Sequence, residues 1–296
     1  LNVGEILTQN KVKVVYTRTK DVFVDLYKRA QIANNANADL FISIHCDAHN
    51  SNAYGAGTFV LGLHANERNF KIAQKENSVI YLEENYEQKY DGFDPNNPES
   101  VISLVLMQEE YLDQSIVAAN YIQEFFVKDL NRRDRKVKQA GFLVLRNTYM
   151  PSVLIEAGFL TNKTEGQYLN SSKGQKEISS SISKAILKYL STLDSNLVNL
   201  PETFKFNNKG EFLFKVQISA SSKSLELKSY NFNGLNKLSK SNSNGLYKYY
   251  HGSTTDYNEV KKLLKNAKNK GFKSAFIAVF KEGQPYSLKK YLDEFE

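Results

Sequence analysis

The chain has 296 residues, 41% of them hydrophobic, which is enough for one large domain or two smaller ones with a sizeable core. No stretch approaches the roughly 18 consecutive apolar residues of a membrane helix, and the single cysteine, Cys46, excludes an internal disulfide framework and a zinc site built from several cysteines. The formal charge of +7 is uneven: residues 1–190 carry 22 basic and 22 acidic side chains, residues 191–204 carry two acids, and residues 205–296 carry 17 bases and eight acids, so the C-terminal part could meet an anionic polymer.

The first elements alternate between strand and helix. Residues 11–18 (KVKVVYTR) are rich in valine and predict a strand, and residues 21–39 have the apolar spacing of a helix. Residues 39–45 (DLFISIH) and 57–63 (GTFVLGL) predict two further strands. Strand, helix and strand at this spacing favour a parallel sheet covered by helices.

An insertion at about residues 67–113 interrupts this alternation, and it contains an acidic stretch rich in Asn and Pro. A helical pattern returns from residue 101 to about 126, and residues 131–139 (NRRDRKVKQ) are polar and basic. The predicted buried face of that helix consists of Leu104, Met107, Tyr111, Ala118, Ile122 and Phe125.

Two buried strands are predicted next, at residues 141–146 (GFLVLR) and 151–159 (PSVLIEAGF). Asn162 and Glu165 then have the spacing of a capping box, so a helix should begin there. The long helix expected after it turns Ile178, Ile182, Ile186 and Tyr189 inward.

The C-terminal part is expected to be a separate domain. Residues 191–210 have the polarity and the proline of a linker. Strands are predicted at 212–220 and 245–252, then a helix stopped by Gly271, then a strand at 274–283. The predicted fold class is therefore α/β, with a mostly parallel sheet flanked by helices, followed by a small α+β domain at 211–296.

His45 lies where a buried strand ends. Strand alternation places it on the same side as Phe41 and Ser43, and ligands of open α/β sheets bind at the carboxyl edge. A neutral imidazole there suits zinc. A hydrogen-bonded structural histidine is the commoner alternative for an isolated His, and His49, four residues later in a loop-like stretch, has no defined ligand geometry.

Glu156 ends a second buried strand in the same way. A carboxylate at that position is costly to bury unless it meets a metal or a water on which it acts, and a Glu beside a metal-activated water is a usual general base. Pairing with Arg146 is the structural alternative. If both strands lie in one parallel sheet, His45 and Glu156 emerge at the same edge.

Several segments resemble the zinc-dependent N-acetylmuramoyl-L-alanine amidases of bacterial cell-wall turnover. They are VVYTRTKD, LYKRAQIANNANADLFISIHCDAHN, GTFVLG and MPSVLIEAGFLTN, within residues 1–190. The resemblance implies an α/β fold, His45 as a Zn²⁺ ligand and Glu156 as the catalytic acid and base. It also implies two more ligands, a His and a Glu, which we expect upstream of Leu1, so that this sequence starts inside the catalytic domain.

Some members of that family carry an inhibitory helix where residues 67–113 fall, and its glutamate blocks the metal until a protein activator displaces it. By resemblance, the regulatory candidates here are Glu83, Glu84, Glu87, Glu109 and Glu110. A solvated acidic insertion is the alternative for each of them.

The C-terminal motifs, FKVQISA, GLYKYYHG and GFKSAFIAVF, resemble a SPOR domain. That resemblance implies binding to peptidoglycan glycan strands. The charge of +9 also permits nucleic acid, but no interleaved aromatic and basic motif is present, so we expect no nucleic-acid partner. Residues 247–250 (YKYY) could stack on sugars or simply pack within a strand.

The sequence thus predicts a zinc hydrolase that cleaves the amide between N-acetylmuramic acid and L-alanine, for wall remodelling or daughter-cell separation. We expect a periplasmic or cell-envelope location and a signal peptide upstream of the sequence given. Two alternatives stay open: a non-catalytic wall-binding scaffold with a degenerate amidase domain, and another zinc hydrolase, such as a carboxypeptidase, acting on stem peptides.

Overall fold

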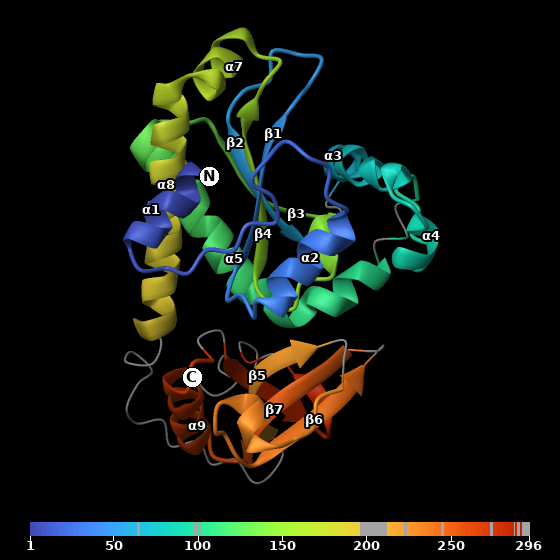
Figure 1. Cartoon of the computed structure of the whole chain (residues 1–296), viewed down its shortest axis with the longest axis vertical. Coiled ribbons are helices and arrows are strands. Elements are labelled where there is room, and N and C mark those ends of the chain that lie inside the picture. The colour runs from blue at the N-terminus through green and yellow to red at the C-terminus, as the bar shows by residue number, and fades with distance from the viewer. Residues whose placement is uncertain are drawn as a thin grey trace. The chain divides into compact units, whose positions relative to one another are not determined.

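A computed structural model gives the fold of the chain (Figure 1). It divides into two compact units, Leu1–Ser191 and Thr192–Glu296. The structure describes residues 1–63, 66–97, 100, 102–195, 212–221, 224–243, 246–272, 275–286, 288 and 291, with the side chains of 102–110, 194–195 and 243 left undescribed.

The N-terminal unit contains a four-stranded sheet in the order β1-β4-β2-β3. The strands are β1 (Phe41–Asp47), β2 (Ala56–Leu61), β3 (Asp134–Ala140) and β4 (Ser152–Phe159). The pairs β1–β4 and β2–β3 are parallel, whereas β2 and β4 are antiparallel. The predicted mostly parallel sheet is therefore a mixed one, with two parallel pairings of three. All eight residues of β4 are buried, as a continuous apolar run in a central strand predicts.

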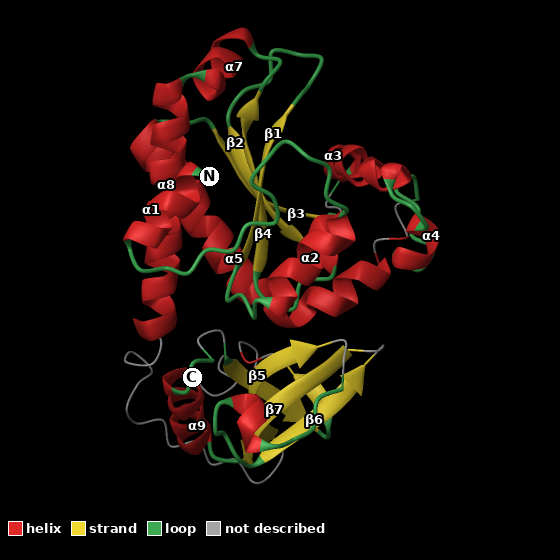
Figure 2. Ribbon diagram, in the orientation of Figure 1, coloured by secondary structure: helices red, strands yellow, loops and turns green. Residues whose placement is uncertain are grey.

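Helices cover both faces of this sheet, and Figure 2 separates them from the strands by colour. Helix α5 packs on the face formed by β2, β3 and β4, and Gln123 of α5 donates a hydrogen bond to the carbonyl of Ala56 in β2. The opposite face lies against the segment that follows β2. The helices are α1 (Asn2–Gln9), α2 (Leu26–Asn35), α3 (Glu67–Asn77), the 3₁₀ helix η1 (Ser78–Leu82), α4 (Tyr86–Lys89), α5 (Ile102–Leu130), α6 (Leu143–Arg146), α7 (Lys163–Asn170) and α8 (Ser172–Ser195).

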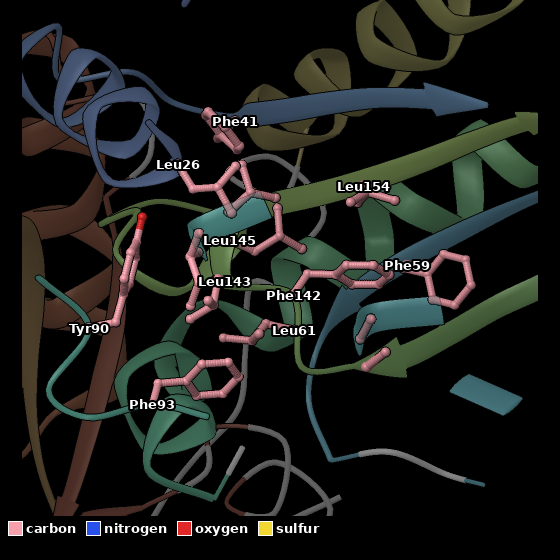
Figure 3. Packing of buried hydrophobic residues seen from close by; sticks show 14 of the residues in the cluster. Leu26, Phe41, Phe59, Leu61, Tyr90, Phe93, Phe142, Leu143, Leu145 and Leu154 are labelled. Atoms are coloured by element: carbon pink, nitrogen blue, oxygen red, sulfur yellow. The ribbon is translucent and has the colours of Figure 1, made fainter. Parts of the chain in front are cut away.

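The core on the second face gathers side chains from both ends of the unit (Figure 3). Phe59 of β2 and Phe142 before α6 meet edge to face, with ring centroids 5.2 Å apart. Leu26 of α2 and Tyr90 after α4 join the same cluster. The segment after β2 is therefore part of the hydrophobic core.

The helical predictions after β4 are confirmed. The side chain of Asn162 accepts a hydrogen bond from the backbone N–H of Glu165 and caps α7. The four inward positions of α8 are all buried: Ile178, Ile182, Ile186 and Tyr189. In α5, Tyr111, Ala118 and Ile122 are buried as predicted, but the helix buries Phe126 more deeply than Phe125, while Leu104 and Met107 lie outside the described side chains.

The strand predicted at residues 11–18 is wrong, because this segment is irregular and helix α2 is shorter than predicted. A strand exists only when its backbone groups pair in a ladder, and no described strand pairs with this segment. Val15 and Tyr16 are exposed, which agrees with the lack of a neighbour.

The strand predicted at residues 141–146 is wrong, and a strand forms in residues 131–139, where none was predicted. The apolar run at 141–146 forms the short helix α6 instead of a strand, and Asn77 of α3 accepts a hydrogen bond from the backbone N–H of Leu143 at its start. The basic stretch before it forms β3. Short apolar runs do not distinguish a buried helix from a strand, and edge strands often carry charges.

The C-terminal unit is a five-stranded antiparallel sheet in the order β6-β7-β5-β8-β9. Helix α9 (Tyr257–Asn269) packs on one face, with Val260 and Leu264 in the core. The predicted strands correspond to β5, β7 and β8, and two short strands were missed; a 3₁₀ helix precedes β6. The bounds are β5 (Phe212–Ser221), η3 (Ser229–Phe232), β6 (Leu238–Ser243), β7 (Leu246–Thr254), β8 (Phe276–Lys281) and β9 (Gln284–Tyr286).

Candidate functional site

The two strand ends singled out in the sequence meet in the sheet. His45 of β1 and Glu156 of β4 are direct partners in the parallel ladder. Residues that are paired in this way project to the same face. The expected convergence of the two side chains at one edge is therefore what the structure shows.

The ladder is irregular immediately after this pair, because Asp47 is opposite Phe159 and β4 has one extra residue there. Gly158 takes up the irregularity with φ +156°. A Cβ on this glycine would lie 2.5 Å from Nη2 of Arg132 and 2.9 Å from the carboxyl group of Glu165. Bulges of this kind often re-aim a side chain beside a functional site.

Glu165 of α7 stabilises the irregular part of β4. Its buried carboxylate accepts hydrogen bonds from the backbone N–H groups of Gly55 and Phe159, and it forms an ion pair with Arg132 at 2.5 Å. Arg132 in turn donates to the carbonyl of Ala157, the residue after Glu156. The backbone around Glu156 is therefore fixed on both sides.

The carboxyl group of Glu156 has no partner of its own. The residue is 4% exposed, and neither of its carboxylate oxygens has a hydrogen-bond partner among the described residues. Burial, followed by the negative charges of Asp47 and Glu76, raises the pKa of Glu156 from 4.5 to about 9. A buried and unpartnered acid is costly, and such groups concentrate where a ligand or a reaction needs them.

His45 is held by groups at both ring nitrogens. Nδ1 lies 2.9 Å from a carboxylate oxygen of Glu76, and Nε2 lies 2.9 Å from the hydroxyl of Ser43. Burial would raise the pKa of Glu76, but the hydrogen bond and charge of His45, with Lys75 and Arg29, outweigh burial and lower it. Glu76 comes from α3, in the segment that follows β2.

Three side chains therefore converge, from β1, α3 and β4. Potential ligand atoms of His45, Glu76 and Glu156 all lie within 4.8 Å of one another, and no other such group of three forms among the described residues. One imidazole and two carboxylates are ligands that suit zinc. The orphaned carboxylate of Glu156 and this donor set fit a divalent cation.

Sequence reasoning missed Glu76. It pointed to the carboxylates of the insertion, but helical periodicity could not show which of them reaches the sheet. The following Asn77 fixes the end of α3, because its buried side chain donates to the carbonyl of Gly141 and accepts from the backbone N–H of Leu143, but these contacts leave no local signal in the sequence.

Three of the five predicted regulatory residues lie outside the cluster of His45. Glu83 is buried, and its carboxylate accepts hydrogen bonds from the backbone N–H of Leu26 and from the hydroxyl of Tyr90. Glu84 and Glu87 are exposed and lie outside the cluster of His45, while Glu109 and Glu110 fall outside the described side chains.

The other polar residues after His45 have structural contacts. Asp47 is buried and accepts a hydrogen bond from the backbone N–H of Ala48. His49 is exposed and interacts with Ser51 and Thr161. Cys46 is an exposed free thiol.

An α/β sheet with a histidine and two carboxylates at one edge, one of them buried without a partner, is an arrangement suited to metal-assisted hydrolysis. A family described as N-acetylmuramoyl-L-alanine amidase matches residues 1–188, and the chain belongs to this family of hydrolases. The family and the enzyme class that the sequence motifs predicted are thereby confirmed.

The chain is also similar to individual amidases. The chain is 29% identical over 198 residues to the amidase AmiA of Salmonella typhimurium and 28% identical over 198 residues to AmiA of Escherichia coli K12. Each alignment covers 66% of this chain and 66% of the relative, so the chain spans just under two thirds of their length. A solved N-acetylmuramoyl-L-alanine amidase from Clostridium difficile 630 has 27% identity and a TM-score of 0.47, covering 64% of this chain and 79% of that one.

Proposed function

We propose that the N-terminal unit hydrolyses the amide bond between N-acetylmuramic acid and L-alanine in peptidoglycan. Family membership supports the reaction. The observation that carries the proposal for this chain is the pair formed by His45 and Glu156, in which a potential ligand and a buried, unpartnered acid occupy directly opposed positions at one sheet edge.

His45 is proposed as a ligand of Zn²⁺. A catalytic zinc site uses three protein ligands as a rule, and His45 is the one proposed from this part of the chain. When bound, the metal would polarise the scissile carbonyl and make a water easier to deprotonate. His45 reaches the metal through one ring nitrogen, while a hydrogen bond at the other orients the ring.

Glu156 is proposed as the general base and then the general acid. Burial, and after it the negative charges of Asp47 and Glu76, raise the pKa of Glu156 and so its affinity for a proton. A cation at His45 would offset those charges and let the carboxylate act as a base. The same group then delivers the proton to the leaving nitrogen of L-alanine.

Glu76 is proposed as the regulatory carboxylate, because among the described side chains of the insertion it is the one that joins the cluster of His45. Glu109 and Glu110 stay predictions. It lies in α3 and contacts His45 at 2.9 Å, so it competes for the ring nitrogen or for the metal's open position. Movement of α3, driven by an activator, would relieve this contact. Replacing Glu76 with Gln should then raise activity, whereas a loss of zinc from Glu76→Gln would identify Glu76 as a permanent ligand.

The test of the reaction is Glu156→Gln in the complete protein. Purified peptidoglycan is digested, and newly exposed α-amino groups are labelled and counted over time. We expect the variant to lose at least about a hundredfold in rate, with Glu124→Gln, an exposed carboxylate on α5, as the matched control. Undiminished release by the Glu156 variant would refute its role, and no release by any form would favour the non-catalytic scaffold.

For the C-terminal unit we propose binding to glycan strands, as its SPOR-like motifs suggest. Phe214 and Val216 face α9, so Lys215 projects from the opposite face of the sheet. Its ammonium lies 5.5 Å from the ring of Tyr250 and 5.3 Å from that of Phe280. Tyr250 is buried, so the surface offers the cation and the half-buried ring of Phe280 to a polar sugar chain. Lys215→Ala in the full chain should weaken co-sedimentation with amidase-stripped glycan, and unchanged co-sedimentation would refute this surface.

A substrate in the wall implies a periplasmic or cell-envelope location, which we propose for the protein. Within the described part of the chain, no helix combines the length and apolarity required to cross a bilayer. Cell fractionation of a tagged chain tests this location directly.

A further inference from the structure

One row of residues crosses the sheet from the proposed acid to a cation. Glu156 of β4 is directly opposite Gly57 of β2 in the antiparallel ladder. On the other side of Gly57 stands Arg135 of β3, because a Cβ placed on this glycine would lie 3.4 Å from the Cβ of Arg135. Glu156 and Arg135 therefore share a face, with no side chain from β2 between them.

The guanidinium of Arg135 is fixed but not neutralised. Its central carbon lies 4.8 Å from the ring centroid of Phe159, and Nη1 donates to the carbonyl of Tyr54 at 2.9 Å. No carboxylate of the described residues lies within ion-pair distance of it. By contrast, the neighbouring Arg132 pairs with Glu165, and Lys136 pairs with Asp134.

A second cation extends the same surface. Arg133 is exposed and lies over the ring of Tyr54, with its guanidinium carbon 4.9 Å from the ring centroid. Tyr54 is itself 47% exposed. Two arginines and exposed aromatic surface thus border the edge of the sheet at which Glu156 lies, and a guanidinium fork is suited to binding a carboxylate through two hydrogen bonds.

The distance between β4 and β3 is compatible with the length of a short extended peptide. Neighbouring strands lie about 4.8 Å apart, so the backbones of β4 and β3 are separated by about 10 Å across β2. An extended peptide advances about 3.4 Å per residue. A carboxylate on the second residue of a peptide whose first nitrogen is at Glu156 would therefore come within reach of the long side chain of Arg135.

We propose that Arg135 binds a carboxylate of the stem peptide, on the second residue after the scissile amide, and so selects acidic over amidated stems. This inference rests on the proposed amidase function, because it assumes that the peptide leaves from Glu156 toward β3. Arg133 adds a weaker, more exposed attraction for the same charge.

The alternative is that Arg135 only ties the loop of Tyr54 to Phe159. A purely structural arginine would alter stability but would not distinguish a carboxylate from a carboxamide. The test therefore measures discrimination. Two soluble muramoyl dipeptides are compared, one with an acidic second residue and one with its carboxamide, by calorimetric binding in zinc-containing buffer.

Binding is measured in the Glu156→Gln background, so that the ligand is not consumed. We expect the acidic ligand to bind at least about tenfold more tightly than the carboxamide, since charge-assisted hydrogen bonds are lost in the latter. Adding Arg135→Gln should abolish the preference, while Lys128→Gln, an exposed residue of α5, should leave it unchanged.

The proposal would be overturned if the Arg135→Gln protein kept the same preference for the acidic ligand as the chain with Arg135. It would also be overturned if the chain with Arg135 showed no preference, or bound neither ligand. The readout is independent of hydrolysis. If the Glu156→Gln chain binds with the expected preference while the chain that retains Glu156 releases no peptide, the amidase function is refuted and the carboxylate site stands.

Discussion

The buried carboxyl group of Glu156 predicts an unusual dependence of stability on pH in the metal-free protein. Burial, together with the charges of Asp47 and Glu76, raises its pKa from 4.5 to about 9. Between these values the folded protein retains a proton that the unfolded chain has released, so the free energy of unfolding falls as pH rises. The contribution is fully favourable below pH 4.5 and is lost as pH approaches 9.

The slope is about 1.4 kcal/mol per pH unit for one proton. At pH 7.5, three units above the unfolded value, the penalty is about 4 kcal/mol relative to a neutral side chain of the same shape. Glu156→Gln carries no such penalty. The stability of the variant relative to the native chain should therefore rise by about 1.4 kcal/mol for each unit between pH 5.5 and 8.5.

The assay is calorimetric unfolding in a metal chelator at several pH values, compared between the native chain, Glu156→Gln and the exposed control Glu124→Gln. Titration of all other groups is common to the three proteins and cancels in the differences. A stability difference for Glu156→Gln that does not change with pH would show that the native carboxyl is ionised at neutral pH, and would refute the reasoning.

Three further changes test the scaffold around the site. Gly158→Ala should destabilise the unit by about 2 kcal/mol in denaturant unfolding, since the new methyl group would lie 2.5 Å from Arg132, and an unchanged midpoint would contradict the bulge. Ile182→Ala, at the buried face of α8, should cost about 2–5 kcal/mol, and a cost below 1 would show that the helix packs loosely. Glu83→Ala should cost about 3 kcal/mol, because it leaves the N–H of Leu26 and the hydroxyl of Tyr90 without their acceptor; near-normal stability would mean that water replaces the carboxylate.

Secondary structure was predicted best for elements whose apolar pattern alone determines whether a strand or a helix forms. Strand β4 is a continuous apolar run with both faces buried, and α8 repeats its apolar residues at helical spacing over many turns. The placement of His45 and Glu156 at one edge was predicted on the condition that their two strands lie in one parallel sheet, because adjacent parallel strands end at the same edge. Strands β1 and β4 meet this condition.

The errors arose where tertiary contacts decide. The run at 141–146 is apolar enough for a strand, but Asn77 caps it as a helix from a distant segment. Strand β3 is polar because it lies at an edge; its Arg135 stacks on Phe159, and Arg133, just before the strand, stacks on Tyr54. Neither contact leaves a local sequence signal.

Glu76 shows the same limit at the site itself. Its role depends on where α3 lies relative to β1, which no periodicity specifies. The family resemblance predicts a regulatory insertion and points to five of its glutamates. In the structure one of them, Glu83, supports the start of α2, whereas Glu76, which was not named, reaches His45.

The central claim is that the site formed by His45 and Glu156 cleaves the bond between the lactyl group and L-alanine. Mass spectrometry of the soluble products from purified peptidoglycan identifies the bond that is cut. The account predicts intact stem peptides beginning with a free L-alanine, released by the complete protein and absent with Glu156→Gln. Shortened stem peptides, or products that persist unchanged in the variant, would contradict it.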